Sequence, residues 1–239
     1  MIGGCNVNKK YMISIIAVVV VIVGVVTYFV LDKSLGNNVE VESVINQENA
    51  VASSKENANV ATVSAEELKG NWNIADGSKV YWSVTTSKET VNFVNEGVTG
   101  KWNLDVQDSS VISGEGIVDM NVLDSGNETR DSHVKEREDL LAVVDYPEAT
   151  FVTKSFSELP TEWNAGDIVP VTIEGTVTVK GVEKEVEFES EVMYQDEQLL
   201  LSGETMVTFE DFGMKSPHTV VLEAENELIV QLELILDKG

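Results

Sequence analysis

Apolar and polar residues alternate along most of the chain after residue 78. A period of two places the apolar side chains on one side of an extended strand. The alternation is strictest from Val171 to Val179, after which Lys180-Gly181 provides a tight reversal. Further segments with this pattern lie at 79–86, 90–94, 98–106, 111–124, 186–194, 197–209 and 226–236.

About eight strands follow from this pattern, each with one apolar face and one face rich in carboxylates. An open sheet would leave strand edges exposed, whereas closing an eight-stranded meander pairs every edge and encloses an apolar lumen. The sequence therefore predicts an all-β fold, an eight-stranded antiparallel barrel with one short helix. An immunoglobulin-like sandwich is the alternative, although the alternating region lacks the Cys pair typical of that fold.

Residues 12–31 form a run of 20 residues without a charge. As a helix this run would be about 30 Å long, which matches the hydrocarbon core of a bilayer. Lys9 and Lys10 precede it, so the positive-inside rule predicts that residues 1–11 are cytoplasmic and that everything after the span is exported. We expect a single-pass anchor in the cell membrane and an extracytoplasmic domain, periplasmic or on the cell surface.

Residues 32–69 separate this span from the alternating region. They contain no aromatic residue, and they cannot bury enough apolar surface to offset the entropy of ordering them. We expect a flexible linker, in which Ser64 and Glu67 can cap a short helix. A faint small-x-small pattern at residues 34–36 leaves cleavage by a signal peptidase open. One domain follows, over residues 70–239.

Charge and cysteine content narrow the function classes. The formal net charge is −25 at pH 7, and nearly all of it follows residue 69. Such a surface repels nucleic acid and anionic lipid head groups. The single Cys5 excludes an intrachain disulfide, and His133 and His218 form a poor zinc set without cysteine partners. We expect no metal site and no cofactor.

Several segments resemble the YceI-like family. The longest is NETRDSHVKEREDLLAVVDYPEATF at 127–151, where an Arg-Asp-x-His motif on a short helix leads into a Tyr-Pro-x-x-x-Phe strand start. Shorter matches occur in the family's order, namely WNIADGSKVYWSV, GKW, IVDMNVLDSGN, GTVTVKGVEKEV and FEDFGM. Together they span residues 70–239. The chain departs from the family pattern at Glu210, where a basic residue is frequent, and at Trp102, where Phe is usual.

The resemblance implies a lipocalin-like barrel whose lumen binds polyisoprenoids or other long-chain amphiphiles. It is not a family of established enzymes, and a homodimer would be unsurprising. Phe212 in FEDFGM is a candidate lid or core residue. Other aromatic residues in strand patterns are candidates for lining the lumen, with core packing as the alternative for each: Trp82, Phe93, Trp102, Phe151 and Phe188.

Arg130 and His133 are three residues apart and share a face of the short helix that Asn127 can cap. In one interpretation they hold a ligand phosphate or carboxylate at the barrel mouth. In the other, Arg130 pairs with an acidic neighbour and fastens the helix over one barrel end, which we favour because buried arginines are usually paired. We expect no catalytic residues, because neighbours on one helix cannot form a Ser-His-acid triad.

These observations lead us to expect a membrane-anchored, extracytoplasmic protein without enzymatic activity. Its lumen would hold a long-chain isoprenoid or fatty amphiphile. The alternative is a non-catalytic adhesion or scaffolding domain whose acidic surface meets a cationic partner.

Overall fold

The computed structural model describes residues 36–45, 62–217 and 223–239. Residues 38–239 form one compact unit, which contains every helix and strand named below. The predicted span at 12–31 and the predicted cytoplasmic segment at 1–11 lie outside the described residues. Among the residues that are described, no helix has both the length and the apolar character needed to cross a membrane.

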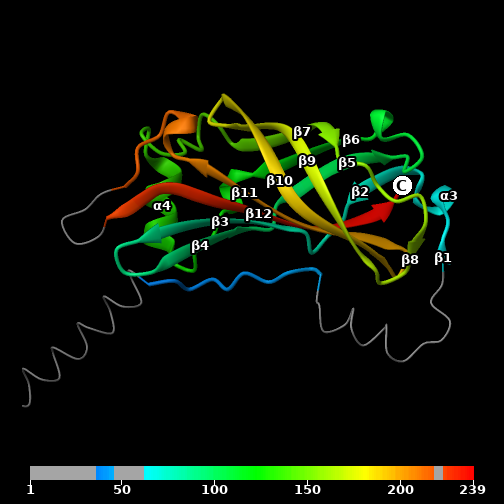
Figure 1. The fold of residues 1–239 in the computed structure, drawn as a ribbon. Coiled ribbons are helices and arrows are strands. Elements are labelled where there is room, and N and C mark those ends of the chain that lie inside the picture. Colours follow the sequence, from blue (N-terminus) through cyan, green and yellow to red (C-terminus); the bar gives the residue numbers. More distant parts are fainter. Residues whose placement is uncertain (1–35, 46–61, 218–222) are drawn as a thin grey trace, which may run out of the picture. The chain divides into compact units, whose positions relative to one another are not determined.

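A closed antiparallel barrel forms the compact unit (Figure 1). Hydrogen-bonded neighbours follow the order β11–β10–β9–β7–β6–β5–β2–β12, and β12 pairs in turn with β11. This ring confirms the predicted eight-stranded barrel and excludes the sandwich. The strands are β2 (Gly70–Ile74), β5 (Val98–Leu104), β6 (Ser113–Asp119), β7 (Glu148–Phe156), β9 (Ile168–Val179), β10 (Val182–Gln195), β11 (Gln198–Thr208) and β12 (Ala224–Lys238).

The hairpin of β3 (Lys79–Thr86) and β4 (Thr90–Asn95) extends two of these strands. β12 pairs with β2 near its C-terminus and with β3 along its earlier part, so β2 and β3 act as one interrupted strand. β4 and β5 form a second interrupted strand. At that break the buried Asn95 donates from Nδ2 to the Asp119 carbonyl (2.8 Å) and accepts from the Gly97 amide (2.9 Å). Its side chain thereby satisfies backbone groups at the interruption.

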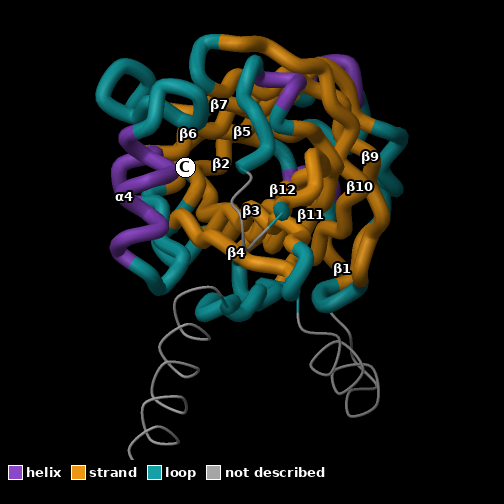
Figure 2. The backbone as a smooth tube through the Cα atoms, turned by 90° about the vertical axis from the view of Figure 1, so that its left-hand side faces the viewer, coloured by secondary structure: helices purple, strands orange, loops and turns teal. Residues whose placement is uncertain are grey.

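Short elements cover both ends of the barrel (Figures 1 and 2). The end at which the chain terminates, here called the α3 end, carries β1 (Thr62–Val63), α3 (Ala65–Leu68), η1 (Ser109–Val111) and β8 (Trp163–Asn164). The opposite α4 end carries η2 (Met120–Val122), α4 (Glu128–Glu136) and η3 (Glu210–Phe212). Asn127 caps α4 as expected, because its Oδ1 accepts from the amides of Thr129 and Arg130, both at 3.1 Å.

The alternation seen in the sequence places apolar side chains inside the barrel. Val171, Ile173, Val177 and Val179 of β9 are buried, and the polar residues between them, Thr172, Glu174, Thr176 and Thr178, are not. Gly175 occupies the remaining inward position, and a Cβ there would lie 2.3 Å from the Phe151 ring. The ring therefore lies across the glycine, so the interior is filled at a position that has no side chain of its own.

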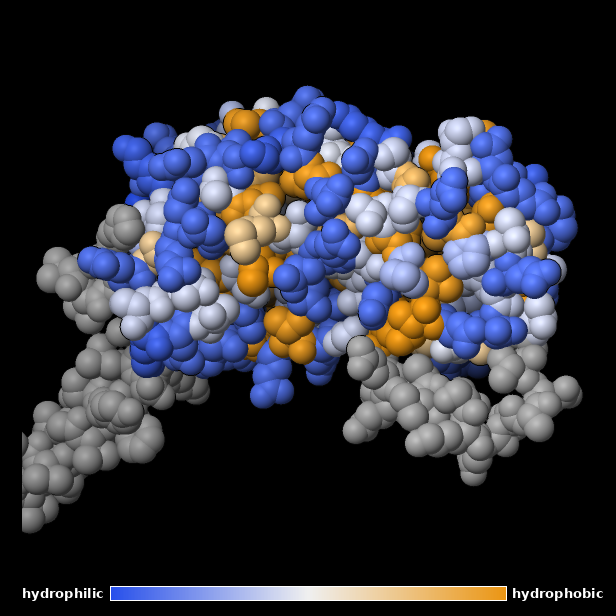
Figure 3. Space-filling model, viewed as in Figure 1, coloured by the Kyte–Doolittle hydropathy of each residue, from blue (hydrophilic) through white to orange (hydrophobic). Residues whose placement is uncertain are grey.

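The outer surface is mostly polar. On the face shown in Figure 3, hydrophilic residues surround smaller apolar areas. The glutamates that alternate along β10 contribute to this surface at positions 183, 185, 187 and 189, where they are exposed. Acidic side chains facing water account for a large negative charge on a barrel with an apolar interior.

Residues 38–45, here called the strap, lie against the outside of the barrel (Figure 1). The strap depends on Glu233 of β12, which is 0% exposed. The Glu233 carboxylate accepts hydrogen bonds from the Val44 amide (2.7 Å) and the Ser43 hydroxyl (3.1 Å) of the strap. It also accepts from Ser202 Oγ (2.7 Å) and Gln231 Nε2 (2.6 Å) of the wall. These bonds replace the water that the carboxylate loses on burial.

The expectation of a flexible linker over residues 32–69 therefore does not fit two stretches of it. The strap packs on the barrel, and residues 62–68 form β1 and α3. Neither stretch contains an aromatic residue, as the sequence indicated. The strap is attached by hydrogen bonds to side chains far along the chain, above all to a carboxylate almost 190 residues later, and local composition does not reveal them.

Replacing Glu233 with Ala should release the strap. The substitution leaves the Val44 amide and several side-chain donors without their acceptor, and unsatisfied buried groups each cost about 1–3 kcal/mol. We expect faster hydrogen exchange at the Val44 amide and a lower free energy of unfolding. Glu227→Ala, at an exposed position on the same strand, is the control and should change neither. Unaltered exchange at Val44 in Glu233→Ala would show that the strap is held in another way.

Candidate ligand-binding lumen

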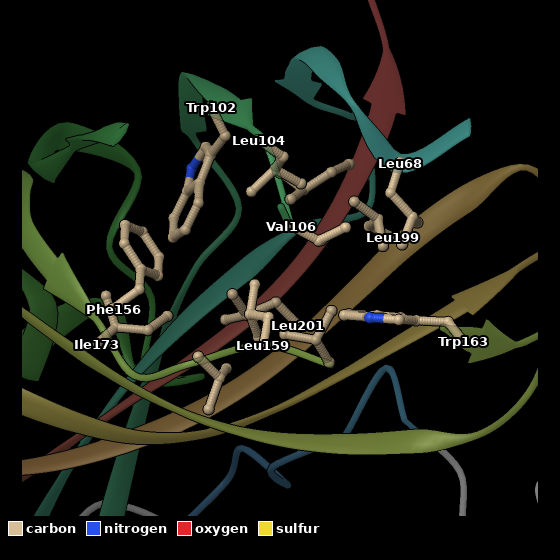
Figure 4. A pocket seen from close by; sticks show the side chains of 13 residues that line it. Leu68, Trp102, Leu104, Val106, Phe156, Leu159, Trp163, Ile173, Leu199 and Leu201 are labelled. Atoms are coloured by element: carbon tan, nitrogen blue, oxygen red, sulfur yellow. The ribbon is translucent and has the colours of Figure 1, made fainter. Parts of the chain in front are cut away.

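Two small cavities lie inside the barrel. The first, of about 30 Å³, is near the α3 end and is bordered by side chains that include Leu68, Trp102, Phe156, Trp163 and Leu201. Figure 4 shows these side chains pointing toward one another from different strands and loops. The second cavity, of about 50 Å³, lies toward the α4 end, and its lining includes Trp82, Trp102, Val118, Phe151, Phe188 and Val230.

Trp102 borders both cavities and separates them. It lies on β5, its side chain is 3% exposed, and its ring meets Phe156 edge-on with 5.9 Å between centroids. Gly114 on β6 lies directly opposite, and a Cβ there would come within 2.6 Å of the indole. The large ring therefore fits because the facing strand presents only backbone at that position.

The chemistry of the two cavities is uniform. Neither lining contains a charged side chain, and Thr150 is the only hydroxyl-bearing residue among them. Such cavities favour apolar guests, since they offer almost nothing to hydrate a charge. Pockets for drug-sized ligands usually measure about 300–1,000 Å³. A long-chain guest would therefore require lining side chains to move.

Two apolar side chains and a few local polar contacts close the α3 end of the barrel. Leu68 of α3 and Trp163 of β8 both border the first cavity. Trp163 donates from Nε1 to the Pro160 carbonyl (2.7 Å) of its own loop. Lys69 forms an ion pair with Asp105 (2.8 Å), which ties the end of α3 to the loop after β5. This closure rests on short local elements and leaves the wall strands unbroken.

The α4 end is closed differently, because two wall strands separate there. β10 and β11 pair only from Glu189 and Glu204 toward the α3 end, and beyond this point each keeps one strand partner. The turn that contains η3 packs against both strands. Phe212 of η3 is 1% exposed, and Asp211 accepts from Lys184 of β10 at 2.5 Å. Lys184 holds the pKa of the Asp211 carboxyl below its ordinary value.

A family model for the YceI-like domain matches residues 72–234 of the chain. This protein belongs to the YceI-like family. The matched region contains all of the barrel wall except the ends of β2 and β12. None of the curated proteins compared with the chain matches it.

Solved structures with the YceI-like fold resemble this barrel at low sequence identity. BcnA of Burkholderia cenocepacia is 18% identical, with a TM-score of 0.58, over 68% of this chain and 98% of that one. A polyisoprenoid binding domain from Saccharophagus degradans, implicated in plant cell wall breakdown, is 12% identical with a TM-score of 0.58, over 72% and 99%. The YceI protein of Campylobacter jejuni is 18% identical with a TM-score of 0.51, over 62% and 86%.

The structure separates the candidate residues into groups. Four of the aromatic residues predicted from strand patterns border the second cavity, namely Trp82, Trp102, Phe151 and Phe188. Phe93 and Phe212 are buried in the core without bordering either cavity. Arg130 is half-buried and His133 is exposed on α4, and neither borders the first or the second cavity. In this YceI-like barrel, the helix motif therefore lies apart from these two cavities.

Sequence reasoning missed the residues that close the first cavity. Leu159 and Trp163 lie in the loop between β7 and β9, where no alternation marks them. Two large apolar residues within a polar, proline-containing loop were the available signal. Phe156, at the end of β7, was missed as well, because a register shift between Thr153 and Ser155 interrupts the alternation before it.

The buried residue of α4 is Asp131, which lies between the two candidate ligand-binding residues Arg130 and His133. Its carboxylate accepts hydrogen bonds from the Ser125 amide (3.0 Å) and the Ser125 hydroxyl (2.6 Å). Burial raises the pKa of the Asp131 carboxyl, and the bonds from Ser125 oppose the rise. Burial lowers the pKa of the Arg130 guanidinium, which the charges of Asp131 and Glu89 partly offset.

We expect Asp131 to hold α4 in place. Asp131→Ala removes the acceptor of two buried hydrogen bonds and should lower the free energy of unfolding by about 1–3 kcal/mol in denaturant titrations. Arg137→Ala should cost under about 1 kcal/mol, because Arg137 and its partner Asp139 (2.5 Å) are at the surface. Should Arg130→Ala cost clearly more than Asp131→Ala, the arginine would be the main brace of the helix.

Proposed function

We propose that this protein binds a polyisoprenoid or another long-chain amphiphilic lipid in the barrel lumen. The observation that carries the proposal is the apolar interior enclosed by the strand ring, in which two cavities without charged lining flank Trp102. An enclosed apolar space suits a hydrocarbon chain and little else. The proposed function is binding without chemical turnover.

Two further facts support the choice of ligand. The chain belongs to the YceI-like family, and one of the structures that resemble it is described as a polyisoprenoid binding domain. Burial of a hydrocarbon chain gains about 0.8 kcal/mol for each CH₂ group, so a chain of about twenty carbons gains roughly 16 kcal/mol before ordering costs.

We also propose that residues 12–31 anchor the barrel to a membrane and that the barrel lies on the extracytoplasmic side. The support is the charge-free run itself, together with Lys9 and Lys10 before it. Anchoring would place the barrel beside a membrane, the source of long-chain lipids. It would also hold a strongly acidic domain near a surface that its charge alone would not approach.

A substitution that fills the lumen should reduce lipid loading. Ala149 is buried and borders the second cavity, so Ala149→Phe places a ring in the space that the lipid would use. Val152 on the same strand is 53% exposed, and Val152→Phe is the matched control. We expect native mass spectrometry after incubation with a lipid extract to show lipid on the wild type and on Val152→Phe, with at least a severalfold loss on Ala149→Phe.

Denaturant unfolding of both variants checks that Ala149→Phe remains folded, since overpacking costs about 1–3 kcal/mol. A folded Ala149→Phe protein that loads lipid like the wild type would place the lipid outside the lumen. A wild-type protein that never takes up lipid would favour the adhesion or scaffolding alternative.

Protease accessibility tests the proposed topology. Protease added outside intact cells or spheroplasts should digest the barrel, while the N-terminal segment remains protected. Digestion only after permeabilisation would show that the barrel lies on the cytoplasmic side. Replacing Lys9 and Lys10 with Glu should weaken the orientation preference and raise the protected fraction.

A further inference from the structure

Exposed apolar side chains gather at the α4 end of the barrel. In the part of the chain that the structure describes, eight large apolar residues are exposed. Five of these belong to the α4 end, onto which Figure 2 looks, and the other three are spread over the strap, η1 and β7. The five are Val122, Val144, Tyr146, Val182 and Met206.

Three of these residues form one patch, here called the tip. Val144 and Tyr146 lie in the loop between α4 and β7, and Val182 begins β10. The Tyr146 ring lies against Gly181, where a Cβ would be 3.0 Å from it, and Gly181 directly precedes Val182. Single exposed apolar residues are common on protein surfaces, whereas a group of neighbours at one end indicates a surface that binds something.

The loop that carries Val144 and Tyr146 is fastened to the barrel. The amides of Leu141 and Val143 donate to carbonyls of α4 at 3.3 and 2.8 Å, and both side chains are buried. Val144 is the next residue and is 90% exposed. Its side chain therefore adds nothing to the packing of the barrel, although the backbone that presents it is fixed.

The strap brings the proposed membrane anchor to this same end. A Cβ on Gly126, the residue before the cap of α4, would lie 2.7 Å from the Cβ of Asn38, the first residue of the strap. From there the strap runs along the outside of the barrel (Figure 1). Residues 32–37 alone separate Asn38 from the charge-free run at 12–31.

The reach of this short connection selects the end that meets the membrane. In any conformation, six residues between Leu31 and Asn38 span at most about 25 Å. By contrast, β12 has 15 residues and is about 50 Å long. An anchor at 12–31 therefore keeps the α4 end close to the bilayer, while the α3 end can lie much farther away.

The chemistry of the tip suits a lipid surface. Tyrosine combines an apolar ring with a polar hydroxyl and is enriched where membranes meet water, and small apolar side chains can enter the boundary between head groups and acyl chains. The acidic barrel is not attracted to anionic head groups. Docking must therefore come from the apolar side chains, helped by the high effective concentration that a tether provides.

We infer that the tip docks on the lipid surface of the membrane that holds the anchor. The inference rests on the proposed anchor at residues 12–31 and adds which face of the barrel meets the bilayer. The pairing of β10 with β11 also ends on this side, at Glu189, and the adjacent Phe188 borders the second cavity. Docking places this interruption of the wall beside the source of the proposed guest.

A fluorescent probe on the full chain tests which end meets the bilayer. Cys5→Ser removes the native thiol, and either Val144→Cys or Val111→Cys then supplies one cysteine for labelling with an NBD fluorophore. Val111 is the matched control, because it is also an exposed valine (47%) but lies on η1 at the α3 end. Each labelled chain is reconstituted into phosphatidylcholine vesicles with or without spin-labelled phosphatidylcholine, which quenches nearby NBD.

We expect the spin-labelled lipid to lower the emission of the probe at position 144 about twofold, because a docked tip lies at the head-group and acyl boundary. The emission of the probe at position 111 should stay nearly unchanged. Vesicle flotation of the same samples reports separately whether the chain is anchored.

A charged substitution in the tip provides a second measurement. With the probe on Val182→Cys, adding Val144→Glu should remove most of the quenching, since a carboxylate is costly to bring into the lipid boundary. Val152→Glu is the control and should leave the quenching unchanged, because Val152 is exposed on the barrel wall (53%). Both positions are exposed, so the barrel should remain folded in each variant.

The contrary outcomes are distinguishable. Chains that float with the vesicles without quenching at position 144 would overturn the docking and leave the anchor standing. Chains that do not float would overturn both. Quenching at position 111 alone would put the α3 end against the bilayer. A probe at position 144 that lipid does not quench, but that becomes shielded from iodide as the protein-to-lipid ratio rises, would assign the tip to a second copy of the chain.

Discussion

Pairing of β12 on both of its edges is the constraint on which this structure depends. β12 bonds to β11 along eleven residues of β11, and on its other edge it bonds to β3 and then to β2. These contacts bring the last strand of the chain against the first ones and turn a meander into a ring. Once the ring is closed, inward side chains lose contact with water. A polar group there would lose its hydrogen bonds to water, so apolar side chains are favoured. The apolar lumen and the acidic exterior both follow from this closure.

Inside the barrel, two large aromatic side chains each pack against a glycine of a facing strand. Phe151 lies over Gly175 and Trp102 lies over Gly114, positions where any Cβ would collide with the ring. These pairs let large rings fill a narrow barrel, and the first and second cavities on either side of Trp102 are small.

Polar contacts on the outside and at the ends of the barrel hold the strap, α4 and the turn that contains η3, which are not part of the strand ring. Glu233 secures the strap through hydrogen bonds, and Asp131 secures the start of α4 through Ser125. Lys184 and Asp211 join β10 to the turn that occupies the separation between β10 and β11. Each of these carboxylates is partly or fully removed from water and retains specific donors. This is the arrangement that makes a buried acidic group tolerable in a highly acidic protein.

The strand pattern was sufficient to predict an all-β barrel, since inward and outward positions alternate with the pleat and the wall had to close to bury its apolar face. It also identified Trp82, Trp102, Phe151 and Phe188 as residues of the interior. The sequence could not show that Glu233 would be buried, that Trp163 would cap the first cavity, or that Asp131 would be the buried residue of α4. Each of these depends on contacts between segments far apart in the chain, or on the rotation of a helix relative to the barrel. Periodicity determines which side of a strand a residue occupies, whereas only the closed structure decides what lies opposite it.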